Sequence, residues 1–150
     1  MTVPERGVLA NVAPVTDIQI VVGAAIIRDG AVLAAQRSHP PLLRGRWELP
    51  GGKVDPGEAE TDALVRECRE ELGVRVRPLR RIGGDVAFPA REEGPSAVLR
   101  VWTAGLADGD EPEALEHLSL RWLRPESLTE VDWLPADVPF LADIRPHLLG

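Results

Sequence analysis

The sequence predicts an α+β fold in which helices cover a mixed β-sheet. Three observations support this: short apolar, β-branched runs separated by turn signals, an amphipathic helix in mid-chain, and a helical segment near the C-terminus. The 150 residues contain no internal repeat, and a hydrophobic content of 44% is enough for one core. We expect residues 1–15, with two prolines and mixed polarity, to form a flexible tail before a single domain at 16–150.

The first elements predict a β-hairpin and a short strand. Residues Ile18–Arg28 are β-branched and apolar, the Asp29-Gly30 pair is a hairpin turn signal, and Ala31–Gln36 form the return strand. A loop with prolines and arginines follows. Residues 47–49 then predict a short strand that leads into a glycine-rich loop at 50–58.

The glycine-rich loop at 50–58 suits a phosphate ligand. Its three glycines allow backbone N–H groups to come close to a ligand that bulkier residues would exclude. Lys53, the only lysine in the chain, adds a point charge for a phosphate oxygen. Pro56 and Gly57 make a turn before the mid-chain helix.

The mid-chain helix has two neighbouring stripes of different chemistry. At about 100° per residue, four side chains form an apolar stripe that would pack on a core: Leu64, Val65, Cys68 and Leu72. The neighbouring stripe consists of four glutamates: Glu60, Glu67, Glu70 and Glu71. Gly73 stands where a left-handed residue commonly ends a helix.

The clustered glutamates predict a site for a hard divalent cation. Like charges three or four residues apart on a helix repel each other, and Mg²⁺ or Mn²⁺ between them would remove that repulsion. One Cys and three scattered His do not provide a zinc site. The alternative is a solvated helix face with salt bridges, in which Arg66 reaches Glu70. The preceding glycine loop argues against that alternative.

The rest of the chain predicts three strands and a final helix. The strands are expected at 74–88, 97–106 and 118–123, with a polar turn at 91–94, and the helix at 140–149, where Pro146 is an awkward interior residue.

The loop and helix together resemble the signature of the Nudix hydrolases, which implies an α/β/α sandwich with a mixed β-sheet between helices. The matching positions are Gly52, Glu58, Arg66, Glu67, Glu70, Glu71, Gly73 and Val74. Cys68 departs from the pattern, since the family has Leu, Ile or Val there. Because Cys is small and apolar, we expect it to pack on the core and not to act as a catalytic thiol.

The resemblance extends to the stretches VVGAAIIRDGAVLAAQRS, GRWELPGGKV and VDWLPADVPFLADI, which look like the MutT-type branch. That branch hydrolyses nucleoside triphosphates to a monophosphate and pyrophosphate, and the likeness is greatest to members that act on CTP, dCTP or 8-oxo-dGTP. The resemblance implies that Arg37 and Lys53 contact phosphates. It also implies a Mg²⁺ site, for which Mn²⁺ could substitute, formed by the Gly51 carbonyl and by Glu67, Glu70 and Glu71, with one glutamate helping to deprotonate water.

A fourth acidic ligand is expected from the segment 108–117, which holds five acids. Glu116 best matches the family position when Trp122 is used as the anchor, so we assign it to the metal and catalytic set with Glu67 and Glu70. The alternative is an acidic, solvated turn, and we prefer that interpretation for the other acids of the segment, including Glu111 and Glu113.

Recognition of the base is assigned to three residues. Asp137 stands where related enzymes for oxidised purines carry Asn, and a carboxylate could accept a hydrogen bond from the exocyclic amine of cytosine. The alternative is that Asp137 caps the last helix. Phe88 and Arg91 occupy family positions near the base, although Phe88 could equally belong to the core.

Two other functions stay open. A Nudix hydrolase of ADP-ribose or another nucleoside diphosphate derivative is favoured by Pro89, which lies fifteen residues past the signature. A non-catalytic nucleotide sensor is the alternative of a different class. A net charge of −7 argues against a nucleic-acid polymer as partner, because such binding depends on clustered Lys and Arg.

The cellular location is expected to be cytoplasmic. A single Cys gives no disulfide framework, and no apolar run predicts a leader or a membrane span. The sequence leaves open whether the protein is a monomer or a homodimer.

Overall fold

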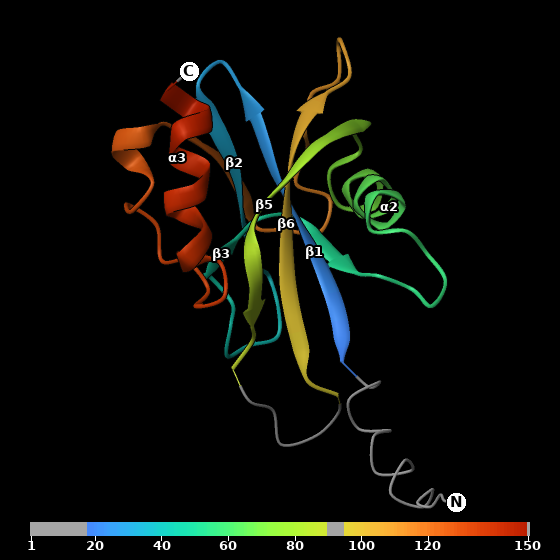
Figure 1. Ribbon diagram of the computed structural model, residues 1–150. Coiled ribbons are helices and arrows are strands. Elements are labelled where there is room, and N and C mark those ends of the chain that lie inside the picture. The colour runs from blue at the N-terminus through green and yellow to red at the C-terminus, as the bar shows by residue number, and fades with distance from the viewer. Residues whose placement is uncertain (1–17, 90–94, 150) are drawn as a thin grey trace, which may run out of the picture.

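The computed structural model describes residues 18–89 and 95–149 (Figure 1). The tail predicted at 1–15 and the residue Arg91 lie outside this range. Within the described residues, the strands form one seven-stranded mixed sheet, and helices α2 and α3 lie on opposite sides of it (Figure 1). The predicted α/β/α sandwich is confirmed. No helix in the described residues combines the length and the apolar character needed to cross a membrane.

The elements follow the chain in this order: β1 Gln19–Arg28, β2 Ala31–Gln36, β3 Trp47–Glu48, β4 Gly51–Lys53, α2 Glu60–Leu72, β5 Val76–Ala87, β6 Ala97–Leu106, β7 Ser119–Leu123, two 3₁₀ turns at Pro125–Ser127 and Val138–Phe140, and α3 Leu141–Leu149.

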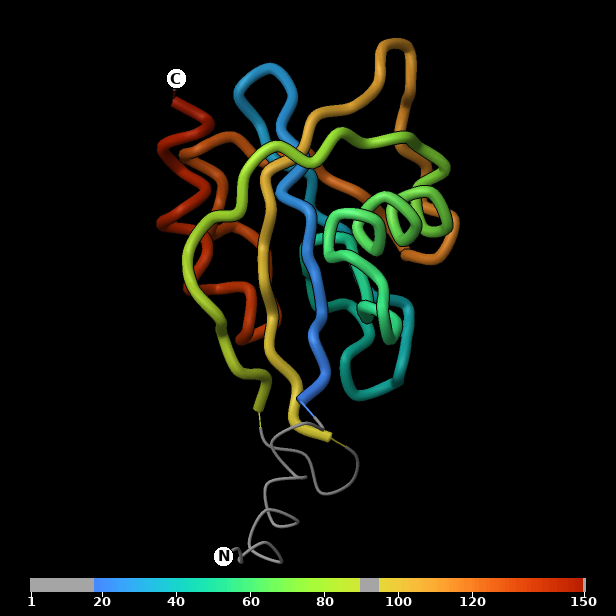
Figure 2. Tube along the Cα trace, turned by 45° about the vertical axis from the view of Figure 1, so that its right-hand side comes forward, coloured from blue at the N-terminus to red at the C-terminus, as the bar shows by residue number. Residues whose placement is uncertain are grey.

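Strand β1 is the centre of the sheet. It runs parallel to β6, which in turn pairs antiparallel with β5 at the edge (Figure 2). On its other side β1 pairs with two strands in succession, with β4 near its start and with β2 near its end. The predicted hairpin is confirmed, because both Asp29 and Gly30 have positive φ, as a tight two-residue turn requires.

The first part of the predicted glycine loop is a strand, so that prediction was wrong in part. Residues Gly51–Lys53 pair with Val21–Gly23 of β1. Gly51 has a φ of 156°, and a Cβ there would lie 1.9 Å from the Val22 carbonyl oxygen. The absence of a side chain is therefore what lets β4 approach β1, a close contact that local sequence rules do not reveal.

Alternation along β1 divides the apolar side chains between two cores. Val22, Ala24 and Ile26 pack towards α2, whereas Ala25 packs towards α3. The predicted stripe of α2 is confirmed, since Leu64, Cys68 and Leu72 are fully buried and Val65 is partly buried. Burial raises the pKa of the Cys68 thiol well above its usual range, which fits a packing role and not a nucleophilic one.

The helix predicted at 140–149 is confirmed, with a start one residue later than predicted. A 3₁₀ turn at Val138–Phe140 precedes α3, which starts at Leu141. Pro146 is inside this helix, and its cost is offset by the packing of Ile144 and Leu148 into the core.

Gly73 supplies a test of how α2 ends. Its φ is 69° and its N–H donates to the Arg69 carbonyl at 3.0 Å. Because an L-residue is strained in this conformation, we expect Gly73→Ala to lower the free energy of unfolding by about 1–2 kcal/mol in urea denaturation. Gly84→Ala is the control, since no atom lies within 4 Å of a Cβ there and its φ is not positive. Equal stability of the two variants would contradict this account.

Candidate active site

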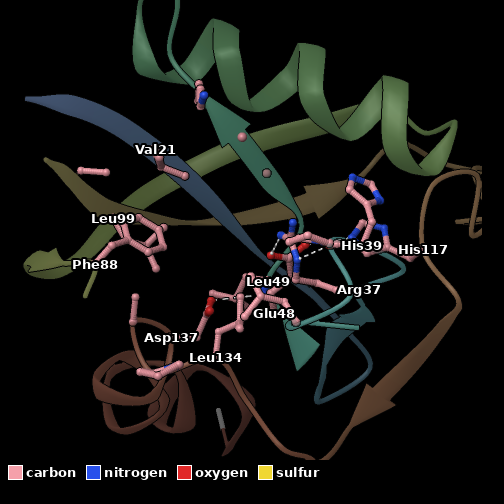
Figure 3. Close-up of a pocket in the computed structure, with 18 of the residues that line it drawn as sticks. Val21, Arg37, His39, Glu48, Leu49, Phe88, Leu99, His117, Leu134 and Asp137 are labelled. Atoms are coloured by element: carbon pink, nitrogen blue, oxygen red, sulfur yellow. Dashed lines mark hydrogen bonds and ion pairs between the residues drawn. The ribbon is translucent and has the colours of Figure 1, made fainter. Parts of the chain in front are cut away.

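One pocket of about 770 Å³ opens where β1 and β4 meet the segments that follow β2 and precede the last 3₁₀ turn. Its two sides differ in chemistry (Figure 3). Val21, Phe88 and Leu99 form an apolar side, and Arg37 and His117 lie at the other. Among the predicted residues that the structure describes, the pocket is lined by Arg37, Gly51, Lys53, Glu71, Phe88, Glu116 and Asp137.

Glu71 is the buried acid of the glutamate helix. Its exposure is 8%, and its carboxylate accepts a hydrogen bond from the Gly51 N–H at 3.3 Å. Burial, followed by the nearby charges of Glu48 and Glu67, raises the pKa of Glu71 well above its usual range. A carboxyl in this position needs either a proton or a cation to compensate for the lost solvation.

Glu67 lies directly against the glycine strand. Arg66 donates to its carboxylate at 2.8 Å, and a Cβ on Gly52 would fall 2.3 Å from the Glu67 carboxyl carbon. Any larger residue at 52 would therefore displace Glu67. This close approach explains in physical terms why the signature needs glycine at this position.

Arg66 joins the helix to the loop before it. Its guanidinium donates to both oxygens of Glu58, at 2.9 and 3.0 Å, and to the Lys53 carbonyl at 3.0 Å. The Arg66 hydrogen bonds hold the pKa of Glu58 at about 2. The distance from Arg66 to Glu70 is 3.8 Å. The predicted Arg66 to Glu70 bridge is thus the longest of these contacts, and the Glu70 side chain stays 54% exposed.

Glu60 does not belong with the other glutamates, which corrects the predicted stripe. It accepts hydrogen bonds from Arg100 and from the Trp102 indole. These contacts fix the start of α2 to strand β6. Of the four glutamates on this helix, Glu67, Glu70 and Glu71 therefore remain as candidate metal ligands.

The donor set fits a hard divalent cation that is shared with a ligand. Within residues 18–89 and 95–149, no three His, Cys, Asp or Glu side chains are arranged to hold an ion by themselves. Mg²⁺ is commonly held by one or two carboxylates together with water and phosphate oxygens. The buried Glu71 and the exposed Glu116 line the pocket, whereas Glu67 and Glu70, on the same helix as Glu71, are not among its lining residues.

Arg37 is bound on two sides by the protein. Its Nη1 donates to Glu48 at 2.8 Å and its Nε donates to the His39 carbonyl at 3.0 Å. Glu48 also contacts His117 Nε2 at 3.0 Å.

Sequence reasoning missed Glu48 and His117. The available signal was an acid at the end of the two-residue strand β3, separated by two residues from the glycine strand β4.

Asp137 does not cap the last helix, so that alternative was wrong. Its side chain makes no cap hydrogen bond and instead accepts the Leu49 N–H at 3.2 Å, with an exposure of 3% (Figure 3). Burial raises the pKa of Asp137 to about 8. Phe88 is half-buried and packs against the core, as the core interpretation expects, and it also lines the pocket, so its contact with a base stays a prediction.

Comparison with known proteins agrees with this geometry. Residues 17–146 match the profile of the NUDIX domain. The chain belongs to the Nudix family. It shares 47% identity over 135 residues with a Mycobacterium tuberculosis (strain ATCC 25618 / H37Rv) protein named "Putative 8-oxo-dGTP diphosphatase 2", a match that covers 88% of this chain and 92% of that protein.

Two further Nudix relatives support the assignment. The "CTP pyrophosphohydrolase" of Escherichia coli (strain K12) is 42% identical over 122 residues, which cover 81% of this chain and 87% of that one. The crystal structure of a MutT Nudix hydrolase from Burkholderia pseudomallei superposes with a TM-score of 0.70 at 32% identity and covers 85% of this chain and 98% of that chain. The Nudix protein described here is therefore a hydrolase of phosphoanhydride bonds, and enzymes of this family generally use a divalent metal ion.

The buried Asp137 of this Nudix protein predicts a pH-dependent stability difference. The folded state keeps the Asp137 proton up to about pH 8, whereas the unfolded state loses it near pH 4. Wild-type stability should fall as the pH rises through this interval. We expect Asp137→Asn, which does not titrate, to gain on the order of 4 kcal/mol relative to wild type between about pH 5 and about pH 9.

Urea denaturation of both proteins across that pH range measures the difference. Asp132→Asn is the matched control, because the Asp132 side chain is 75% exposed and pairs with Arg46 at the surface. A difference between wild type and Asp137→Asn that did not change with pH would show that Asp137 is ionised throughout.

Proposed function

We propose that the protein is a Mg²⁺-dependent nucleoside triphosphate pyrophosphohydrolase that releases a nucleoside monophosphate and pyrophosphate. The proposed substrates are dCTP and CTP, and also oxidised nucleotides such as 8-oxo-dGTP, which would give it a role in sanitising the nucleotide pool. The observation that supports this most is one pocket with a glutamate and arginine side and an apolar side that contains Asp137. The names of the M. tuberculosis and E. coli relatives agree with both nucleotide classes.

The proposed metal site consists of the Gly51 carbonyl and of Glu67, Glu70, Glu71 and Glu116. The bound ion would neutralise charge on the phosphates and lower the pKa of a nearby water. Mn²⁺ would substitute for Mg²⁺, since both are oxygen-seeking divalent ions.

The side chains of the site are proposed to bind the phosphates and to accept a proton. Arg37 and Lys53 would bind phosphate oxygens and hold the chain of phosphates in line for attack by water. Glu67, Glu70 and Glu116 form the catalytic set, from which one carboxylate would accept the proton of that water as the phosphoanhydride bond breaks and pyrophosphate leaves. Glu70 is suited to the proton transfer, because it is half-exposed and its contact with Arg66 is long.

Base recognition is proposed for Asp137, with Phe88 and Arg91 nearby. An ionised Asp137 could only accept a hydrogen bond, as from the exocyclic amine of cytosine. Because its pKa is raised to about 8, a protonated Asp137 could also donate. The ionised form could therefore serve a cytosine nucleotide and the protonated form an oxidised guanine nucleotide, whereas an amide would lack the charged acceptor.

A second candidate function is hydrolysis of ADP-ribose or a similar nucleoside diphosphate derivative. Pro89, which suggested this function in the sequence, lines the same pocket. For either function we propose a cytoplasmic protein that acts alone on a small nucleotide, with no nucleic-acid polymer and no membrane as partner. A monomer and a homodimer are both compatible with this site.

A substrate panel tests the proposed function. With Mg²⁺, wild type should release pyrophosphate from dCTP, CTP and 8-oxo-dGTP with kcat/KM at least about tenfold above that for dTTP, a preference worth about 1.4 kcal/mol. Asp137→Asn should lower kcat/KM for the cytosine nucleotides by about tenfold and affect 8-oxo-dGTP less. Release of AMP from ADP-ribose with no pyrophosphate from any triphosphate would favour the second candidate. Nucleotide binding without any hydrolysis would indicate a sensor.

The glutamate assignment is tested by turnover. We expect Glu70→Gln and Glu71→Gln each to reduce kcat by about 100-fold or more at saturating Mg²⁺, since each removes a proton acceptor or a ligand charge. Glu113→Gln is the control, because Glu113 is an exposed acid of the segment that contains Glu116 and does not line the pocket. Wild-type turnover in both helix variants would remove these residues from the metal and base set.

A further inference from the structure

Glu48 lines the pocket and contacts two residues of its polar side, Arg37 and His117. Its Oε1 accepts a hydrogen bond from Arg37 Nη1 at 2.8 Å, and its Oε2 is 3.0 Å from His117 Nε2. The side chain is 16% exposed, so these contacts are largely shielded from water. Its charge also raises the pKa of both Glu71 and Asp137, the two buried acids that line the pocket.

The contact with Glu48 determines which part of Arg37 is available to a ligand. Nη1 donates to Glu48 and Nε donates to the His39 carbonyl, so the guanidinium plane is fixed by two bonds on different nitrogens. Within the described residues, Nη2 makes no hydrogen bond to the protein. A guanidinium held in this way presents a fixed donor edge to the pocket and loses little side-chain entropy when it binds an anion.

His117 holds Glu48 from the opposite direction. A carboxylate that accepts from an arginine has only acceptor oxygens, so the hydrogen in the His117 contact must be on Nε2. The His117 side chain is 6% exposed, and its Nδ1 has no hydrogen-bond partner in the described residues. The Glu48 contact is therefore the one polar interaction found for this buried ring, and it fixes the rotamers of both partners.

The same contacts join two loops that are far apart in the sequence. Ser38, next to Arg37, donates its hydroxyl to the Glu116 carbonyl at 3.0 Å. The Glu48 carboxylate adds a second connection, through His117, to the segment that carries Glu116. Two connections therefore join the segment of Arg37, the proposed phosphate-binding residue, to the segment of Glu116, the proposed metal ligand.

We propose that Glu48 is a positioning residue that fixes the donor edge of Arg37 for a phosphate group, and that His117 holds Glu48 in the required rotamer. This inference deepens the proposed function and rests on it for the identity of the ligand. Glu48 itself need not touch the substrate.

A double-mutant cycle tests the inference. With dCTP at saturating Mg²⁺, we expect Glu48→Leu to raise KM about tenfold with kcat changed less than about threefold, because binding energy is lost more than chemistry. Glu48→Gln should lie within about threefold of wild type, since its amide oxygen can still accept from Arg37. In an Arg37→Ala background, Glu48→Leu should change KM by less than about twofold, because the residue through which it acts is absent.

Matched variants separate positioning from folding. His117→Gln keeps a donor nitrogen near the position of Nε2 and should resemble wild type, whereas His117→Leu should resemble Glu48→Leu. Glu130→Leu breaks the exposed pair with Arg121, away from the pocket, and should leave KM unchanged. If Glu48→Leu and Arg37→Ala each raised KM about tenfold and the double variant showed the product of the two effects, the inference would be overturned. Equal effects of Glu48→Gln and Glu48→Leu would overturn it too.

Two readouts do not depend on turnover. Nitrogen-15 NMR should show His117 with its hydrogen on Nε2 in the wild type and a changed tautomer in Glu48→Gln. Calorimetry should show inorganic triphosphate, with Mg²⁺, binding about tenfold more weakly to Glu48→Leu than to wild type. If no nucleoside triphosphate is hydrolysed, the proposed function fails, but these two measurements still decide the role of Glu48. A wild-type ring with its hydrogen on Nδ1, or equal triphosphate affinities, would overturn that role.

Discussion

The contact between strand β4 and the glutamate face of α2 is the constraint on which the rest of the site depends. The Gly51 N–H meets Glu71, the Gly52 backbone leaves room for the Glu67 carboxylate, and the Lys53 carbonyl accepts from Arg66. These contacts require β4 to pair with β1 and α2 to pack on the sheet through its apolar stripe. The positions of the carboxylates therefore depend on both arrangements, the pairing of β4 with β1 and the packing of α2 on the sheet.

Burial at this contact changes what the carboxylates can do. Glu58 and Glu71 are both close to the glycine segment, but their pKa values move in opposite directions. Two hydrogen bonds from Arg66 stabilise the charged form of Glu58, whereas Glu71 has few such partners and faces the charges of Glu48 and Glu67. A buried acid with few hydrogen-bond donors and with other acids nearby, such as Glu71, binds a proton or a cation strongly. In a chain of net charge −7, this is how an acidic pocket can accept a still more acidic ligand.

The sequence predicted the features that depend on local patterns. The hairpin turn at Asp29 and Gly30, the apolar stripe of α2 and the helix end at Gly73 follow from residue types at short spacing, and the structure confirms them. The strand character of Gly51–Lys53 was not predicted, because it depends on a partner strand about thirty residues earlier in the chain and on the absence of a Cβ at one position. Glu48 and His117 are separated by 69 residues, so no spacing rule could have brought them together. The cap proposed for Asp137 was locally reasonable but was overridden by the nearby Leu49 N–H.

Two of the acids that line the pocket, Asp137 and Glu71, are buried, and the cost of burying their charge is offset in different ways. Asp137 is buried and can be neutral through its own proton, whereas Glu71 lies near the charges of Glu48 and Glu67 and belongs to the proposed metal site. Glu48 raises the pKa of both through its charge. Its pairing with Arg37 limits that effect and turns the arginine towards the pocket. The requirement to neutralise Glu48 thus provides a physical reason for an arginine at position 37, in addition to any phosphate it binds, because an unpaired carboxylate there would repel both the acidic ligand and the two buried acids.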